Sequence, residues 1–165
     1  MPYAVRPASS WPQTVTLDVG AMAPEFELRN QRREKVSLAD LKGSKVALVF
    51  IPFAFTSTCE GELCEIRDNF DVFEGSGTRV VAITCDTSAT NARWAQENGF
   101  EFDILSDFWP HGEVSRRYDT FNEMFGYAER TTYFIDEGGT ITDVVRSDQL
   151  KQARPFAHYE AALKP

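Results

Sequence analysis

Apolar residues recur in short β-type runs that alternate with helical patterns along the middle of the chain. The run KVALVFI (45–51) is apolar at nearly every position, which is typical of a central strand covered on both faces. Residues 59–73 repeat apolar side chains at spacings of three and four, as one face of a helix does. A second strand at 79–84, a helix at 89–98 and a short strand at 102–105 follow. This order predicts an α/β fold with a central, mostly parallel sheet and flanking helices.

The N-terminal part predicts an extension to this core. Residues 1–24 are polar and rich in proline, so we expect an extended arm. Between residues 26 and 37, two alternating stretches flank a polar turn, which predicts an N-terminal hairpin that leads into a short helix. We therefore expect one folded domain over residues 25–165.

The C-terminal part predicts a second hairpin and a closing helix. Residues 131–135 and 140–146 flank Asp-Glu-Gly-Gly, a strong hairpin signal because glycine permits positive φ. Residues 113–118 are expected to form one or two helical turns and residues 120–129 to be irregular. A helix over 150–163 is predicted to close the chain.

Size and charge restrict the classes of function. With 165 residues, a single domain buries roughly 70% of the surface of the open chain. The net charge of −8 disfavours nucleic acid and anionic membranes as partners. The longest apolar stretch, residues 46–55, has ten residues, whereas a spanning helix needs roughly 20. No secretory signal pattern opens the chain, so we expect an intracellular, cytoplasmic protein without a membrane span.

The chain contains three cysteines, Cys59, Cys64 and Cys85. An odd number in a chain of this size argues against a disulfide framework. No Cys-x-x-Cys or His-x-x-x-His spacing is present, and His111 and His158 lie far from the cysteines in sequence, so no metal site is expected. The thiols are therefore either inert core residues or reactive groups.

Cys59 is the candidate reactive group. It follows the strand 45–51 at the start of the predicted helix, and open α/β sheets place their sites beyond the carboxyl ends of strands. Ser57 and Glu60 match a capping box, which makes Cys59 the second helical residue. Free backbone N–H groups and the helix dipole there favour thiolate over thiol. The alternative is that Cys59 is a small buried hydrophobe, and position alone indicates only a reactive thiol.

Pro52, Thr56 and Cys59 form the pattern Pro-x-x-x-Thr-x-x-Cys, which resembles the peroxidatic signature of the peroxiredoxin family. The resemblance continues in APEFEL (23–28), in LSDFWPHG (105–112) and in RTTYFID from Arg130. Among subgroups, the chain resembles the one-cysteine, alkyl hydroperoxide reductase E-type enzymes of actinobacteria. The resemblance implies a thioredoxin-like fold and a thiol peroxidase that needs no cofactor.

The chemistry of the signature also follows from the residue types. Complete ionisation of a thiol raises its reactivity at pH 7 by at most roughly 30-fold, so a fast peroxidase must also stabilise charge on the peroxide oxygens. The Thr56 hydroxyl, the Cys59 backbone N–H and the Arg130 guanidinium would donate to those oxygens, while Pro52 would shield the pocket. Acidic side chains crowd the predicted helix, which independently favours a cation opposite Cys59. In the family, Glu62 would orient the arginine.

Several alternatives remain open from the sequence. Arg130 could be a solvated charge at a strand end, and Thr56 an ordinary loop residue. Cys64 could be a passive helix residue, or it could form a disulfide with oxidised Cys59, as in bacterioferritin-comigratory proteins. An intact helix holds the two Cα atoms beyond the roughly 7 Å limit for a disulfide. Cys85 is expected to be structural.

Partners and competing functions follow from the same resemblance. It implies a peroxide substrate and reduction by mycothiol with mycoredoxin, or by a thioredoxin-type protein. It also implies a homodimer packed near the active site. Phe108 and Trp109 would form the rim of a pocket and part of the dimer face; the alternative is that they fill the core. A redox sensor, or a disulfide oxidoreductase of the same fold, is the competing function.

Overall fold

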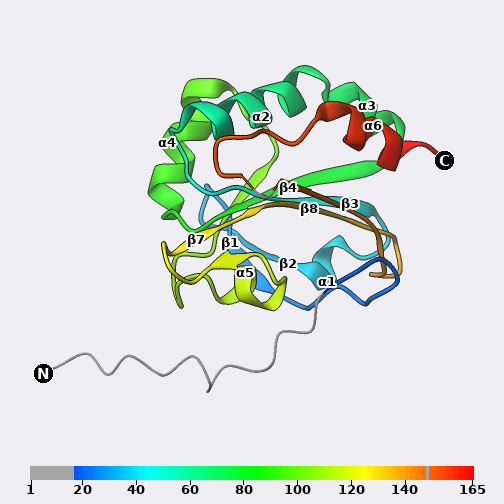
Figure 1. Cartoon of the computed structure of the whole chain (residues 1–165), viewed down its shortest axis with the longest axis horizontal. Coiled ribbons are helices and arrows are strands. Elements are labelled where there is room, and N and C mark those ends of the chain that lie inside the picture. The colour runs from blue at the N-terminus through cyan, green and yellow to red at the C-terminus, as the bar shows by residue number, and fades with distance from the viewer. Residues whose placement is uncertain (1–16, 148) are drawn as a thin grey trace, which may run out of the picture.

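The computed structural model describes residues 17–147 and 149–165, and a seven-stranded sheet forms its centre (Figure 1). The strand order is β2-β1-β5-β4-β3-β8-β9. The bounds are β1 Glu27–Arg29, β2 Lys35–Ser37, β3 Lys45–Phe50, β4 Thr78–Thr84, β5 Asp103–Ser106, β8 Arg130–Ile135 and β9 Ile141–Ser147. The three central strands β3, β4 and β5 are parallel, and the strands on either side pair antiparallel. The predicted α/β class and both hairpins are confirmed.

Helices cover both faces of the sheet. Helices α2, α3, α4 and α6 lie on one face, whereas α1 and α5 lie on the other (Figure 1). The bounds are α1 Leu38–Leu41, α2 Ser57–Asp68, α3 Phe70–Gly75, α4 Ser88–Asn98, α5 Glu113–Arg117 and α6 Phe156–Leu163. Strand β3 contributes to two cores because its side chains alternate: Leu48 and Phe50 pack into one, and Val49 into the other.

The helix predicted over residues 59–73 is two helices. Asn69 interrupts it with φ −116° and ψ 30°, and its side-chain amide donates to the Glu65 carbonyl at 2.8 Å. An asparagine side chain that bonds to the backbone competes with the helical ladder. The predicted helical conformation is therefore confirmed, but the helix is not continuous.

Two segments near the C-terminus also differ from the prediction. Residues 120–129, expected to be irregular, contain a small hairpin formed by β6 (Phe121–Asn122) and β7 (Tyr127–Ala128). The closing helix is shorter than predicted, because only Phe156–Leu163 is helical. Arg154 lies just before this helix and is buried.

Of the predicted N-terminal arm, residues 1–16 lie outside the described residues. In its described part, Leu17 and Ala23 are buried in the core. The backbone N–H of Gly20 donates to the Ile141 carbonyl at 2.8 Å. These residues pack against the start of β9, and the division into arm and domain stays a prediction.

Candidate active site

The loop between β3 and α2 is held in place by the end of the neighbouring strand. The Asp86 carboxylate, just beyond β4, accepts from the Ala54 backbone N–H at 2.9 Å. Burial raises the pKa of Asp86, and the bond from Ala54 opposes that rise. Phe55 has a φ of 61°, a left-handed conformation uncommon for a non-glycine residue. The loop that leads to Cys59 is therefore held by a hydrogen bond to the residue just beyond β4.

The cap of α2 differs from the prediction. Thr56, and not Ser57, is the N-cap residue, and its carbonyl accepts from the Glu60 N–H at 2.9 Å. The Glu60 carboxylate accepts instead from Trp94 Nε1 at 3.0 Å and Asn98 Nδ2 at 3.3 Å, so no capping box forms. Cys59 is the third helical residue, and its backbone N–H belongs to the first turn, where no acceptor exists within the helix.

Cys59 and Arg130 meet although they are far apart in sequence. Strand β8 runs antiparallel to β3, so its first residue, Arg130, lies where β3 ends. Arg130 Nη2 donates to Cys59 Sγ at 3.3 Å, and both residues are buried. Arg130 Nε donates to the Leu150 carbonyl at 2.8 Å. Arg130 Nη1 is buried and makes no hydrogen bond with any described residue.

Behind this pair, Glu62 joins two buried arginines. Arg130 Nη1 lies 3.4 Å from Glu62 Oε1, within ion-pair distance. The backbone N–H and Nε of Arg154 donate to the same carboxylate at 2.9 and 3.0 Å, and Arg154 Nη2 forms a further short contact. Arg154 Nη1 donates to the Phe50 carbonyl at 2.9 Å. Glu62 thereby links α2, the end of β3, β8 and the segment before α6.

The other two predicted residues lie at the edge of this centre. Pro52 lines a small pocket of about 70 Å³ next to Arg130. Thr56 is exposed, and its hydroxyl donates to the Phe53 carbonyl at 3.0 Å. The structure therefore brings Cys59, Arg130 and Glu62 together, whereas no contact joins the Thr56 hydroxyl to Cys59.

The remaining cysteines have different surroundings. Cys64 is half-buried on the same intact helix as Cys59, and its Sγ lies 3.8 Å from Asn98 Oδ1. Burial raises the pKa of the Cys64 thiol, which Arg67 partly opposes. Burial, with Asp107 nearby, raises the pKa of Cys85 to about 12. All three thiols are free.

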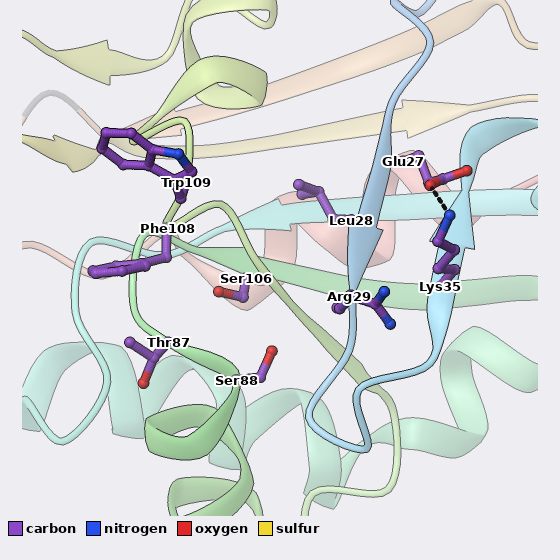
Figure 2. Close-up of a pocket in the computed structure, with 9 residues that line it drawn as sticks. All are labelled: Glu27, Leu28, Arg29, Lys35, Thr87, Ser88, Ser106, Phe108 and Trp109. Atoms are coloured by element: carbon purple, nitrogen blue, oxygen red, sulfur yellow. Dashed lines mark ion pairs between the residues drawn. The ribbon is translucent and has the colours of Figure 1, made fainter.

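A larger cleft of about 440 Å³ lies elsewhere, between β1, the start of α4 and the loop after β5. Figure 2 shows Phe108 and Trp109 on one side of this cleft and Leu28 on the other. The side chains that line it are distinct from those of the pocket beside Arg130. Trp109 is 78% exposed and Phe108 is 48% exposed, so they do not plug the core.

Within residues 17–147 and 149–165, no three His, Cys, Asp or Glu side chains are grouped so that they could hold a metal ion. In the same residues, no helix has the length and apolar character needed to cross a membrane.

A buried cysteine at a helix start, paired with a buried arginine on a thioredoxin-like sheet, defines a class of thiol enzymes. The sequence matches the AhpC/TSA family over residues 19–144. It is 44% identical over 137 residues to alkyl hydroperoxide reductase E of Mycobacterium tuberculosis, covering 82% of this chain and 87% of that protein. It is 30% identical over 146 residues to the chloroplastic peroxiredoxin Q of Sedum lineare, covering 88% and 75%.

Solved structures agree with this assignment. The crystal structure of peroxidoxin BcpB from Mycobacterium tuberculosis superposes with a TM-score of 0.77 at 29% identity, covering 88% of this chain and 93% of that chain. The chain belongs to the AhpC/TSA family of peroxiredoxins, and it is a thiol-dependent peroxidase.

The main residue that sequence reasoning missed is Arg154. It lies in a polar stretch without periodicity, 92 positions from Glu62. The only local signal is Pro155 before the apolar start of a helix, which indicates a helix boundary and not a buried charge.

Proposed function

We propose that Cys59 is the peroxidatic residue, and that the enzyme reduces hydrogen peroxide and organic hydroperoxides. The Cys59 thiolate attacks the terminal peroxide oxygen, an S–O bond forms and the O–O bond breaks. Cys59 becomes a sulfenic acid, and the departing alkoxide or hydroxide takes up a proton to give alcohol or water. A thiol reductant then returns the two electrons and releases water.

One observation carries this proposal: the buried Arg130 Nη1 has no hydrogen-bond partner among the described residues, although Nη2 of the same group contacts the sulfur. Nη1 faces the Glu62 carboxylate only as an ion pair at 3.4 Å, outside hydrogen-bond geometry, so it keeps a donor beside the thiol for a bound substrate. Arg130 would stabilise the thiolate and also the charge that develops on the departing oxygen. The free backbone N–H of Cys59 would supply a second donor.

Pro52, Thr56 and Glu62 complete the proposed site. Glu62, held by Arg154, would orient Arg130, and Pro52 would limit the entry of water through the adjoining pocket. Thr56 would have to turn its hydroxyl away from the Phe53 carbonyl to donate to the peroxide. Rotation of one side-chain torsion at an exposed residue is fast compared with turnover.

The reductant and the assembly are part of the same proposal. We assign the reduction of the sulfenic acid to mycothiol with mycoredoxin, or to a thioredoxin-type protein, because the intact α2 keeps Cys64 away from Cys59. The exposed Phe108 and Trp109 support a homodimer. Three free thiols fit a reducing compartment, which supports a cytoplasmic location.

Stopped-flow consumption of hydrogen peroxide, with a regenerating thiol system, tests the function. Wild type should turn over repeatedly, whereas Cys59→Ser should be inactive and folded, and Cys85→Ala should keep its activity. A single oxidation without turnover would indicate a redox sensor instead. Activity that survives in Cys59→Ser but is lost in Cys85→Ala would overturn the assignment of Cys59.

A further inference from the structure

The pocket beside Arg130 opens between the β6–β7 hairpin, the start of β8 and the segment after β9. Its rim includes Tyr127, Glu129 and Leu150, and it adjoins Pro52 and Arg130. A volume of about 70 Å³ is small for a bulky organic hydroperoxide, so part of such a substrate would extend beyond the pocket. The remainder of such a substrate therefore lies at the rim, and rim residues contact it.

The buried charges behind the pocket balance one another. Arg130 and Arg154 carry two positive charges, and the Glu62 carboxylate with an ionised Cys59 carries two negative charges. The four groups are buried together. Because the four charges sum to zero, their combined attraction for a charged substituent falls off quickly with distance from the pocket.

The Glu129 carboxylate is different because it lies at the rim without a counter-charge. Glu129 is exposed and immediately precedes Arg130. Its Oε1 accepts a neutral hydrogen bond from Asn122 Nδ2 at 3.3 Å. Among the described residues, no Lys, Arg or His nitrogen comes within 4.0 Å of its carboxylate.

We infer that Glu129 is a specificity-determining residue, which makes the enzyme select uncharged hydroperoxides over those with an anionic group near the peroxide. The inference rests on the proposed role of Cys59. Leu150, which is 42% exposed, offers apolar surface to the uncharged substituent, while the Glu129 carboxylate repels an anionic one.

A matched pair of substrates isolates this effect. Cumene hydroperoxide and the same molecule bearing a 4-carboxylate differ by one negative charge at a fixed distance from the peroxide. Second-order rate constants for oxidation of Cys59 are measured at low ionic strength for wild type, Glu129→Gln and Glu101→Gln. Glu101 is exposed and lies outside the pocket, so its variant makes the same change in net charge elsewhere.

In Glu129→Gln, the rate constant for the 4-carboxylate substrate, divided by that for cumene hydroperoxide, should rise by roughly 3- to 10-fold. This is the effect expected from removing the repulsion between two partly screened charges several ångströms apart. In Glu101→Gln the ratio should stay at the wild-type value. An unchanged ratio in Glu129→Gln, or an equal rise in Glu101→Gln, would overturn the inference.

A second measurement needs no variant. For wild type, raising the ionic strength to about 0.5 M should increase the same ratio, because salt screens the repulsion at the rim. A ratio that stays flat or falls with salt contradicts a repulsive rim. Turnover of uncharged cumene hydroperoxide that is lost in Cys59→Ser tests the proposed function separately, so the two failures are distinguishable.

Discussion

Replacing Glu62 by glutamine tests whether the buried charge network holds the active site together. All contacts to this carboxylate come from donors: Arg154 donates from its backbone N–H, Nε and Nη2, and Arg130 Nη1 faces it as an ion-pair partner. The substitution turns one carboxylate oxygen into an NH₂ group, which is itself a donor. At least one arginine contact is therefore lost, and the two buried guanidinium groups no longer have the Glu62 charge between them.

The size of the effect follows from the burial. The side chains of Glu62, Arg130 and Arg154 are at most 2% exposed. Removing one partner from such a buried pair costs about 3 to 5 kcal/mol of unfolding free energy. For a domain of this length, that loss lowers the melting temperature by roughly 6 to 20 °C. Arg130 also loses its anchor, so the rate constant with peroxide should fall.

Thermal unfolding followed by circular dichroism measures this loss, with stopped-flow peroxide reduction on the same samples. Glu65→Gln is the matched control, because Glu65 lies on the same helix but is exposed; its unfolding free energy should stay within about 0.5 kcal/mol of wild type. A Glu62→Gln protein that melts within 2 °C of wild type, with an unchanged rate, would refute the assignment of a structural and positioning role to this carboxylate.

Four further predictions concern the thiols. Arg130→Met should slow peroxide reduction by more than the roughly 30-fold that ionisation explains, and stopped-flow rates that recover fully at high pH would contradict a role in the transition state. Because the pKa of Cys85 is about 12, this thiol should resist iodoacetamide at pH 8 in a mass-spectrometric assay. The folded state holds the Cys85 proton more tightly than the unfolded chain, so its contribution to the unfolding free energy is complete below about pH 9. That contribution should be lost at about 1.4 kcal/mol per pH unit as the pH rises toward 12, and Cys85→Ala should not show this loss in denaturant titrations. Asn98→Ala removes side-chain contacts to Cys64 and Glu60 on α2, so one equivalent of peroxide should give more Cys59–Cys64 disulfide than in wild type. If neither protein forms this disulfide, Cys64 has no resolving role.

The strands and the position of Cys59 could be predicted because they depend on short-range patterns. The run at 45–51 is apolar throughout, and it forms β3 at the middle of the sheet. Cys59 was located by its place after this strand. Arg130 was located only through the family resemblance, because nothing local distinguishes a buried arginine from a solvated one.

Other features depend on contacts that no local pattern contains. The Ser57–Glu60 capping pattern is present in the sequence, but the Glu60 carboxylate accepts hydrogen bonds from Trp94 and Asn98 on α4 instead. At Asn69, between α2 and α3, the side-chain amide bonds to the Glu65 carbonyl. In both places, a specific hydrogen bond outweighs a weak local preference.

The order of Cys59 and Arg154 along the chain also has a consequence for biosynthesis. Cys59 is translated 95 residues before Arg154, the residue that holds Glu62 behind it. At typical elongation rates, roughly 5 to 20 s separate the two events. During that interval Cys59 lacks the complete set of buried charges that surround it in the finished protein. The network of Arg130, Glu62 and Arg154 behind Cys59 therefore forms only after Arg154 has been added to the chain.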